Sequence, residues 1–487
     1  MAAGMLATTL AAHDPTPPTP GPVVIDTDVG IDDVVALALA LQAPELDLAG
    51  LVVTAGAAGP EVGRTHLERL LDRLNRREVR LWAPRPGAAV AGDGRIRAIV
   101  ERVLAAAMPD PVAPMARAFS PAAYAGDRAA PTILVLGPLT TLAAALDEEP
   151  ELARRIGPVV VAGRPDPERS WNLRADRAAY EAVRATGVPM TFVVADDAAR
   201  KPSAWRDRGP AGDRPTSPAA TLFHDLLAPR AVLDHYLDAL GPLHDELALL
   251  YVLHPELFAP GPEPDTVVAR DREDLLAVLD RILRRGRQPK RRVVLREGRL
   301  PDDVLRDDVR ALRDAAVAAH GEDEWYAQLL VNELHEHLGA YSILGVKMGL
   351  RAAELLNAPP HAVQVISGAP AGPPISCLND GLLVATGSTP GRGLFRHQPH
   401  GPDAVRAVFR YNGRSVVLEL RDRYRQRIAA EIGRIRAAHG LENPAYWAEV
   451  RRFGLEIWRD WHRLDLFAVV VLKPDESTPE PSMGDPP

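Results

Sequence analysis

Four aspartates lie within eight residues in the segment DTDVGIDD, directly after an apolar run and directly before a helical one. They are Asp26, Asp28, Asp32 and Asp33. Like charges this close repel one another, and partly buried carboxylates are unfavourable unless a cation neutralises them. The dipole of the following helix favours negative charge in its first turn but cannot neutralise four carboxylates. A hard divalent cation with oxygen ligands is therefore the counter-charge that these residue types predict.

The elements around this cluster alternate between strands and helices. The apolar run PVVI predicts a strand, IDDVVALALALQAP a helix ended by Pro44, and LDLAGLVVTAG a second strand. The alternation returns at PTILVLG and GPVVVAG, and again at RADRAAYEAVRATG and PMTFVVA. Strand, helix and strand in succession form a βαβ unit and hence a parallel sheet. We predict a doubly wound α/β domain in which the aspartates follow the carboxyl end of the first strand, where sites form.

Two protein families share an opening motif with this segment. VVIDTDV has the apolar strand and spaced aspartates of a haloacid-dehalogenase-type phosphatase. The longer segment DTDVGIDD resembles Asp-Thr-Asp-Pro-Gly-x-Asp-Asp of the inosine-uridine-preferring nucleoside hydrolase family, with Val29 in place of proline. Downstream, LGPLTTLAAAL, WNLRADRAA and LHDELALLYVLHPELF resemble further segments of that second family in the same order, and Glu246 replaces the proline of its His-Asp-Pro motif. The phosphatase hypothesis explains only the first segment.

The resemblance to nucleoside hydrolases implies a calcium site. Its ligands would be Asp28, Asp33, Asp245 and the backbone carbonyl of Thr140. Carboxylates and a carbonyl suit Ca²⁺ better than a metal that prefers thiolate or imidazole. The resemblance makes Asp28 the base that takes a proton from the attacking water, in a reaction with an oxocarbenium-like transition state.

The resemblance also implies substrate contacts. Asp32 and Asn172 would bind the ribose hydroxyls, Trp171 would supply the aromatic contact, and His244 would protonate the leaving base or stack near it. Two of these residues have simpler explanations. Asn172 could cap a turn, and His244 could be a loop histidine whose hydrogen bonds are satisfied.

The sequence departs from the family at two substrate positions. Ala57 stands where the family has an asparagine, and Ser170 stands where it has a glutamate that binds the 5′-hydroxyl. Three arginines lie in the same short stretch: Arg164, Arg169 and Arg174. Because arginine binds phosphate in bidentate fashion, we expect a 5′-phosphorylated or otherwise anionic ribosyl substrate, with Arg169 and Arg174 as its contacts. The alternatives are solvent-exposed loop arginines and a binding module that has lost catalysis.

A second group of metal-binding side chains follows much later in the chain. ELHEHLGAYSILGVKMG and GPPISCLNDGLLVATGSTPGRG are similar to segments of the FmdE family, which is named after formylmethanofuran dehydrogenase. The side chains that could meet there are His335, His337, Cys377 and Asp380. Two imidazoles, one thiol and one carboxylate suit a transition metal such as Zn²⁺. The alternative is a buried cysteine with surface histidines.

Composition limits the function classes. The chain has 487 residues, 46% of them hydrophobic, and a net charge of −8, which implies no general attraction to nucleic acid. Cys377 is the single cysteine, which excludes an intramolecular disulfide. No apolar run reaches the length of a membrane span. We expect a cytoplasmic homo-oligomer that acts on a small ribosyl molecule.

We divide the chain into five parts. They are a disordered tail (1–22), the nucleoside-hydrolase-like domain (23–265), a connector (266–322), a smaller α+β FmdE-like domain (323–473) and a second tail (474–487). The predicted function is calcium-dependent cleavage of the N-glycosidic bond of a nucleoside or of a modified or 5′-phosphorylated nucleoside. The alternatives are a non-catalytic nucleotide-binding scaffold and a phosphohydrolase.

Overall fold

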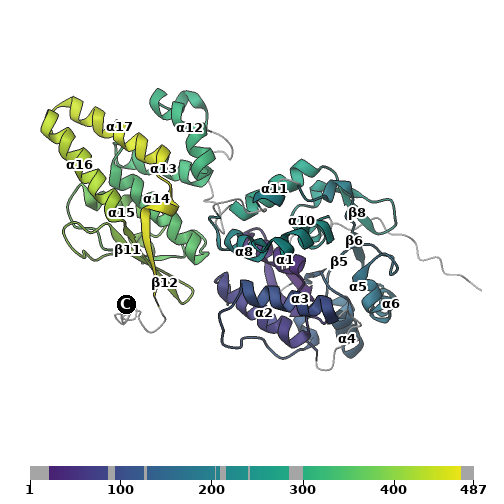
Figure 1. Cartoon of the computed structure of the whole chain (residues 1–487). Helices are drawn as coiled ribbons and strands as arrows, with labels where there is room; N and C mark the ends of the chain where they lie inside the picture. Colours follow the sequence, from purple (N-terminus) through teal and green to yellow (C-terminus); the bar gives the residue numbers. More distant parts are fainter. Residues whose placement is uncertain are drawn as a thin grey trace, which may run out of the picture. The chain divides into compact units, whose positions relative to one another are not determined.

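The computed structural model describes residues 21–85, 94–125, 129–202, 205–208, 215–239, 242–284 and 300–472. The chain forms two compact units (Figure 1). The first unit is Met1–Pro215 with Ala219–Arg284, and the second is Thr216–Pro218 with Arg285–Pro487. The two tails predicted from the sequence lie outside the described residues, except for residues 21 and 22.

The first unit is built on an eight-stranded sheet with the order β3-β2-β1-β4-β5-β6-β8-β7. Neighbouring strands are parallel, except that β7 and β8 are antiparallel. The strands are β1 (Val23–Thr27), β2 (Leu48–Val53), β3 (Leu81–Trp82), β4 (Thr132–Val135), β5 (Val159–Ala162), β6 (Met190–Val193), β7 (Phe258–Pro260) and β8 (Thr266–Ala269). The predicted doubly wound, mainly parallel α/β fold is confirmed.

Helices cover both faces of this sheet. One face carries α1 (Ile31–Gln42), α2 (Pro60–Arg73), α3 (Gly94–Ala107), α8 (Pro218–Leu227), α10 (Asp245–Leu253) and α11 (Arg272–Arg284). The other carries α4 (Thr140–Glu148), α5 (Trp171–Ala175) and α6 (Arg177–Ala185). Alternate side chains of β1 enter the two cores, Ile25 on the first face and Val24 on the second, as the two-residue period of a strand requires.

Helix α1 is buried on almost every side, which explains why its sequence is apolar rather than amphipathic. It packs against α10, as Figure 1 shows. Their N-terminal ends carry Asp32 and Asp33 on α1 and Asp245 on α10. The packing of these two helices therefore unites carboxylates that are more than 200 residues apart in sequence.

The boundary of the first unit differs from the one predicted. The sequence predicts a connector from residue 266 onward, but β8 pairs with β6 inside the sheet, and α11 packs against α1. Strand β8 is only four residues long and follows a Gly/Pro-rich stretch, so its local sequence resembles a domain edge. The remainder of the predicted connector belongs to the second unit, and residues 285–299 lie outside the described residues.

The second unit has a five-stranded sheet with the order β10-β9-β11-β12-β13. Strands β9 and β10 are parallel, and the remaining pairs are antiparallel. The strands are β9 (Gln364–Ser367), β10 (Phe395–His397), β11 (Arg406–Tyr411), β12 (Arg414–Leu420) and β13 (Phe467–Leu472). The helices are α12 (Asp307–His320), α13 (Glu322–Leu334), α14 (Ala340–Leu356), α15 (Leu378–Thr386), α16 (Asp422–His439), α17 (Pro444–Asp460) and α18 (Arg463–Leu466). The predicted smaller α+β domain is confirmed.

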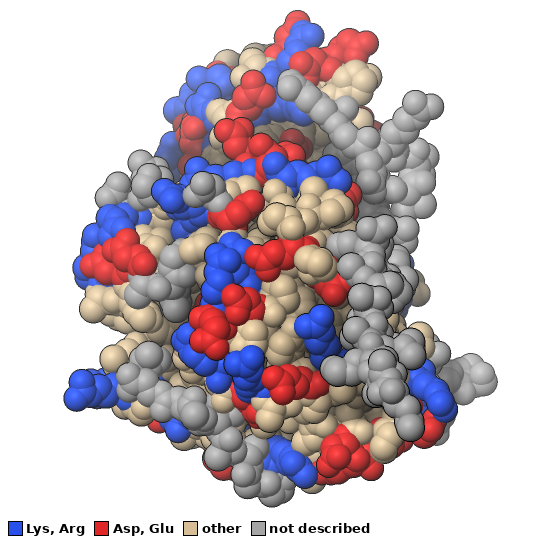
Figure 2. Space-filling view, turned by 90° about the vertical axis from the view of Figure 1, so that its right-hand side faces the viewer, with Lys and Arg blue, Asp and Glu red and all other residues tan. Residues whose placement is uncertain are grey.

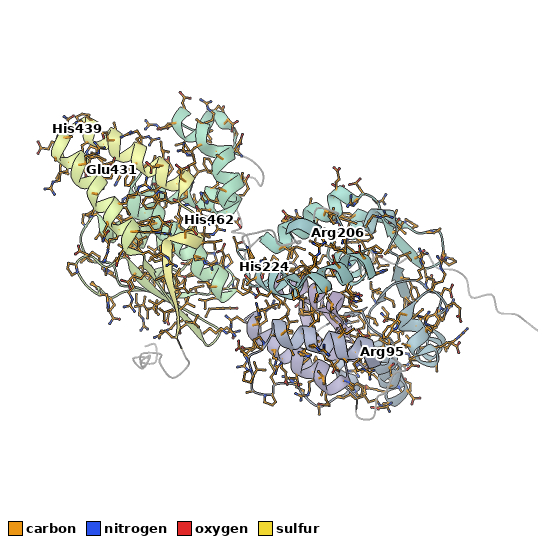
Figure 3. All side chains as sticks on the ribbon, in the orientation of Figure 1. Arg95, Arg206, His224, Glu431, His439 and His462 are labelled. Carbon is orange, nitrogen blue, oxygen red and sulfur yellow. The ribbon has the colours of Figure 1, made fainter. Side chains whose placement is uncertain are left out.

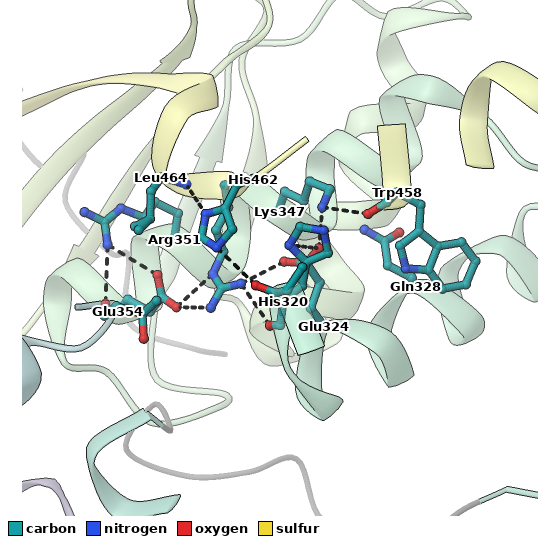
Figure 4. A network of polar contacts seen from close by, with 12 residues as sticks. His320, Glu324, Gln328, Lys347, Arg351, Glu354, Trp458, His462 and Leu464 are labelled. Atoms are coloured by element: carbon teal, nitrogen blue, oxygen red, sulfur yellow. Dashed lines mark hydrogen bonds and ion pairs between the residues drawn. The ribbon is translucent and has the colours of Figure 1, made fainter. Parts of the chain in front are cut away.

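A buried network of charges joins the helices of the second unit (Figure 4). Lys347 in α14 pairs with Glu324 in α13 and donates to the backbone oxygen of Trp458 at 3.2 Å. Arg463 in α18 donates to Glu324 Oε2 at 3.0 Å and to Glu354 Oε1 at 2.8 Å. Two cations thus face two carboxylates, so each buried charge has a partner of opposite sign.

The exposed surface of the chain is mixed in charge. On the face shown in Figure 2, lysine and arginine side chains lie next to aspartate and glutamate side chains over much of the area. Within the described residues, no helix has the length and apolar character needed to cross a membrane.

Candidate active site

The acidic cluster lies where β1 ends and where α1 and α10 begin. Asp32, Asp33 and Asp245 offer oxygen atoms that all lie within 4.8 Å of one another. Asp33 is the most firmly held of the three, because the Thr27 hydroxyl donates to its Oδ1 and the backbone N–H of Gly30 donates to its Oδ2 at 3.1 Å. Two of the three predicted carboxylate ligands, Asp33 and Asp245, belong to this group, and its third member is Asp32 rather than Asp28.

Asp28 enters the cluster from a strained turn. Val29, which follows it, has φ = 62°, a left-handed conformation that is rare for a β-branched residue. The backbone N–H of Ala57 donates to Asp28 Oδ2 at 2.9 Å. A Cβ on Gly56 would lie 1.9 Å from Asp28 Oδ2, and one on Gly137 would lie 2.8 Å from Asp28 Cβ. Glycine at these two positions is what makes room for the Asp28 side chain.

The electrostatics show a surplus of negative charge. Burial, followed by the charge of Asp33, raises the pKa of Asp28 well above its ordinary value. Burial, followed by the charges of Asp32 and Asp33, does the same for the pKa of Asp245. Burial and then Asp33 raise the pKa of Asp32 to about 7. A divalent cation among these groups would favour their ionised forms, so the donor set fits Ca²⁺.

Asp26 has a separate environment from Asp28, Asp32, Asp33 and Asp245, which line the neighbouring cavity. Tyr124 donates a hydrogen bond to its Oδ2, and the side chain is completely buried. Burial raises its pKa to about 7, the bond from Tyr124 lowers it in part, and the charge of Asp33 raises it further. Asp26 therefore lies beneath the acidic cluster, and it is not among the residues that line the neighbouring cavity.

A cavity of about 560 Å³ opens onto the cluster. Its lining includes Asp28, Asp32, Asp33 and Asp245, together with five other polar residues predicted or noted in the sequence: Arg164, Arg169, Ser170, Asn172 and His244. Trp171 also lines it and is 37% exposed. Ile31, Val100, Leu136, Ala162 and Ala195 add an apolar wall. A cavity of this size and character fits a small molecule with a polar and an apolar part.

The segment at 170–172 is positioned by its own hydrogen bonds. Ser170 is the N-cap of α5, and its hydroxyl accepts from the backbone N–H of Leu173. Asn172 Nδ2 donates to the backbone oxygen of Leu136 at 2.6 Å, which directs the other amide atom away from that strand end. Ser170 thus has a structural role, while Asn172 lies in the cavity with one acceptor remaining.

The three arginines of the neighbouring loop have different surroundings. Arg164 and Arg169 line the cavity, and both approach Glu263, at 3.4 Å and 3.8 Å. Arg174 does not line it, and its guanidinium donates to the backbone oxygen of Glu168. Of the three arginines, only Arg164 and Arg169 therefore bring positive charge to the cavity wall, and Glu263 partly offsets that charge.

Two further predicted residues occupy defined positions. His244 is the N-cap of α10 and lines the cavity. Burial, followed by the charges of Lys201 and Arg164, lowers its pKa to about 4, so its ring is neutral near pH 7. Thr140 begins α4, and its hydroxyl donates to Asp176 Oδ2 at 2.7 Å. The role of the Thr140 carbonyl as a calcium ligand stays a prediction.

Four residues near the site carried no clear signal in the sequence. His235 lines the cavity, and its neighbour Tyr236 is fully buried. Lys201 is 6% exposed, and Glu246 is completely buried beside Asp245. In sequence, Lys201 is one lysine in a polar loop and Glu246 is an ordinary helical residue. The replacement of a motif proline by Glu246 was the single available signal.

The second unit holds a smaller cluster. His335, Cys377 and Asp380 offer ligand atoms within 4.8 Å of one another. His335 Nδ1 lies 3.1 Å from Asp380 Oδ2, and His335 Nε2 is buried with no hydrogen-bond partner in the part of the chain that the structure describes. His337 stacks on His335 at 4.2 Å between ring centroids, but its Nδ1 approaches the backbone oxygen of His335. The fold thus unites three of the four predicted residues.

The two units of the chain match two different protein families. The family model for inosine-uridine preferring nucleoside hydrolase matches residues 23–322. The chain belongs to this nucleoside hydrolase family. A second model, described as FmdE, molybdenum formylmethanofuran dehydrogenase operon, matches residues 334–456. Both predicted resemblances are confirmed, in the predicted order.

Individual relatives match the nucleoside hydrolase part. The pyrimidine-specific ribonucleoside hydrolase RihA of Escherichia coli O9:H4 (strain HS) is 31% identical over 260 residues, covering 49% of this chain and 81% of the relative. RihA of Escherichia fergusonii is 29% identical over 258 residues. The solved purine-preferring ribonucleoside hydrolase from Gardnerella vaginalis is 19% identical with a TM-score of 0.41, covering 54% of this chain and 99% of that one. The family match and the 31% identity to RihA show that this chain is an enzyme that acts on N-glycosyl bonds.

Proposed function

We propose that the first unit is a calcium-dependent N-ribohydrolase whose preferred substrate carries negative charge near the 5′ position of the ribose. The observation that carries the proposal is the group of buried and half-buried carboxylates at the wall of the 560 Å³ cavity, Asp28, Asp32, Asp33 and Asp245. The raised pKa values of Asp28, Asp32 and Asp245 indicate a site with more negative charge than its protein partners neutralise.

Calcium, when bound, would hold the attacking water and the ribose hydroxyls and would lower the pKa of that water. Asp28, Asp33 and Asp245 would be its carboxylate ligands, with Thr140 as the backbone ligand. Asp28 would accept a proton from the water as the water oxygen bonds to the anomeric carbon. The bond from that carbon to the base nitrogen would break at the same time, with charge development like that of other glycoside hydrolyses.

The remaining cavity residues would bind and orient the substrate. Asp32 and Asn172 would accept or donate hydrogen bonds at the ribose hydroxyls. His244, with a neutral ring, would donate a hydrogen bond to the leaving base or lie against it, and Trp171 would cover its face. Carboxylates around the anomeric carbon would stabilise the positive charge that develops there.

The arginines support the choice of an anionic substrate. Arg164 and Arg169 line the cavity together with Ser170, which stands where the family motif that this segment resembles has a glutamate. Replacing a carboxylate with a hydroxyl and adding two guanidinium groups favours a phosphate there. Glu263 opposes this preference, because it lies within 3.8 Å of both guanidinium groups.

Asp28→Asn tests the catalytic part of the proposal. Asparagine keeps the shape of the side chain but cannot accept the proton, so kcat should fall by about 10²- to 10⁴-fold. The measurement is release of free base from a nucleoside panel, with inorganic phosphate release measured in parallel. Asp26→Asn is the matched control and should cost much less, since Asp26 is not in the cavity wall. Equal base release by wild type and Asp28→Asn would contradict the proposal.

A matched pair of substrates tests the substrate preference. A nucleoside 5′-monophosphate should have a higher kcat/KM than its nucleoside, and Arg164→Ala and Arg169→Ala should each reduce that ratio. Arg174→Ala is the control, because Arg174 does not line the cavity. Preference for the plain nucleoside in wild type, unchanged in the two cavity variants, would contradict the anionic substrate while leaving the hydrolase function intact.

We also propose that the second unit binds one transition-metal ion, such as Zn²⁺. The buried, unpartnered Nε2 of His335 supports this proposal, with the Cys377 thiol within ligand distance. Asp380 either serves as a third ligand or accepts a hydrogen bond from Nδ1–H of His335 and directs Nε2 at the metal. Burial, followed by the charge of Asp380, raises the pKa of the Cys377 thiol, so metal binding would have to displace its proton.

Elemental analysis of the full chain tests this second site. Wild type should hold one transition-metal ion that is lost in His335→Ala and in Cys377→Ser. His361→Ala is the matched control, because His361 lies in the same unit and its Nδ1 approaches the Gly387 backbone oxygen. Metal content that is equal in wild type and in both site variants would contradict the proposal.

A further inference from the structure

The Glu246 side chain holds the turn that carries His244 and Asp245. Its Oε2 accepts from the backbone N–H of His244 at 3.3 Å, so the side chain reaches back over the first turn of α10. Its Oε1 accepts from the hydroxyl of Tyr236 at 2.6 Å. Both carboxylate oxygens are therefore engaged, and Glu246 is completely buried. A side chain with these two contacts restricts the backbone at the residue that precedes the metal-facing Asp245.

Tyr236 links this turn to the cavity wall from the other side. It lies in a π-helical turn, His235–Ala239, that follows α9 (Arg230–Asp234). Within the turn, His235 lines the cavity and Tyr236 is buried behind it. Arg206, labelled in Figure 3, pairs with Asp234 at 3.0 Å and so ties this segment to α7 (Trp205–Arg208). Local π-helical turns of this kind are frequent at functional sites.

Lys201 is a buried cation whose charge interacts first with Glu246 and then with Asp32 and Asp245. Its Nζ donates to the backbone oxygen of Tyr236 at 3.0 Å and lies 3.8 Å from the centre of the Tyr236 ring. A backbone hydrogen bond, from Leu243 N–H to Ala199 O at 2.8 Å, joins the Lys201 loop to the residue before His244. Lys201 is only 6% exposed, a position that an ammonium group occupies at a high desolvation cost unless anions lie near.

We propose that Glu246, bonded to Tyr236 and balanced by Lys201, is a positioning residue that fixes the His244–Asp245 turn and thereby the geometry of the calcium site. The His-Asp-Pro motif that this segment resembles has a proline at this place, and proline restricts the backbone through its ring. In this chain a buried carboxylate restricts the same turn through hydrogen bonds, at the cost of needing a buried cation. Lys201, Tyr236 and Glu246 therefore act as one unit.

The inference rests on the calcium site proposed above, and it can fail independently of it. Isothermal titration of wild type with Ca²⁺ tests the site itself. If wild type binds no calcium, the proposed function fails and the inference fails with it. If wild type binds calcium and cleaves substrate, the variants below test the inference alone.

Three variants separate positioning from general stabilisation. Glu246→Gln removes the charge and weakens the bond to His244, and the calcium Kd should rise by about 10-fold, with a parallel loss of kcat/KM. Glu246→Pro/Lys201→Met replaces the carboxylate with the motif proline and removes the unpaired cation, and its calcium Kd should return to within about threefold of wild type. Lys201→Met alone leaves Glu246 buried without a cation and should lower the melting temperature in chelator more than the double variant does.

Glu256→Gln is the matched control, because Glu256 is exposed and its carboxylate pairs with His254 at 3.0 Å, away from the Glu246 contacts. It should leave the calcium Kd and the melting temperature unchanged. A merely structural role for Glu246 would lower the melting temperature of Glu246→Gln while calcium Kd and KM stay at wild-type values, and that result would overturn the proposal. A double variant that binds calcium no better than Glu246→Gln would also overturn it.

Discussion

Two groups of buried carboxylates in this chain differ in whether cations balance their negative charge. In the second unit, Glu324 and Glu354 face Lys347 and Arg463, and all four are buried. In the first unit, Asp28, Asp33 and Asp245 face one another. Burial by itself would raise the pKa of Glu324, but Lys347 and Arg463 lower it below its ordinary value. Among the described residues, no such cation lowers the pKa of Asp28, which stays raised.

The difference indicates what each group is for. A charge-balanced network satisfies itself and holds helices together, so it has no need of a ligand. A group with surplus negative charge at a cavity wall is unfavourable until a cation binds. Until then, the repulsion between its carboxylates lowers the stability of the folded chain. The balance of positive and negative charge, rather than the number of buried charges, therefore separates a structural network from a candidate binding site in this protein.

Breaking the balanced network should have the largest effect on stability. Lys347→Met leaves Glu324 buried with one cation fewer and should destabilise the second unit by about 3–5 kcal/mol. The measurement is hydrogen exchange at the amides of α13 and α14. In Lys347→Met/Glu324→Gln, the loss should be smaller than in the single variant, because no uncompensated charge remains. Wild-type protection in Lys347→Met would show that the network is not balanced by Lys347.

Calcium should stabilise the first unit alone. A ligand that binds the native state adds RT ln(1 + [L]/Kd), about 2.7 kcal/mol at a concentration of 100 Kd. Calorimetry of metal-free protein with and without calcium should show one unfolding transition shifted upward and the other unmoved. A shift of both transitions, or of neither, would contradict the contrast between the two groups.

The surplus of negative charge predicts a pH dependence in chelator. The folded-state pKa values of Asp26 and Asp32 are about 7, above their ordinary value of 3.8. Stability from these two groups is therefore complete below about pH 4 and is lost as the pH rises toward 7. The melting temperature of metal-free protein should fall between pH 5 and pH 7.5, and the gain from added calcium should grow over the same interval. A chelated protein more stable at pH 7.5 than at pH 5 would contradict the surplus.

The smallest expected effect concerns the arginines at the cavity. Glu263→Gln removes the counter-charge of Arg164 and Arg169, all three of them partly exposed. Pairs in contact with solvent contribute about 0.2–1 kcal/mol, so the preference for a 5′-monophosphate should rise by roughly 1.4- to fivefold. The check is the ratio of kcat/KM for the matched substrate pair. An unchanged ratio would mean that Glu263 does not limit the charge of the cavity.

Much of the fold followed from local patterns in the sequence. Buried β-branched runs and apolar helices alternate from Val23 onward, and their order predicted the parallel sheet that the structure contains. The boundary near 266 did not follow, because β8 is only four residues long and its place between β6 and β7 depends on pairing with both. Short strands depend on their neighbours, so their local sequence carries little information.

The sequence by itself predicted the acidic cluster and a cation as its counter-charge, because four carboxylates in eight residues repel one another wherever they lie. It also indicated Asn172 and His244, which line the cavity. Only the tertiary structure decided which other residues join them. Lys201 lies in a loop and Tyr236 in a π-helical turn, and their burial near Glu246 exists only after the sheet and helices assemble. Burial and the balance of positive and negative charge depend on which residues are neighbours in space. A single sequence does not specify those neighbours.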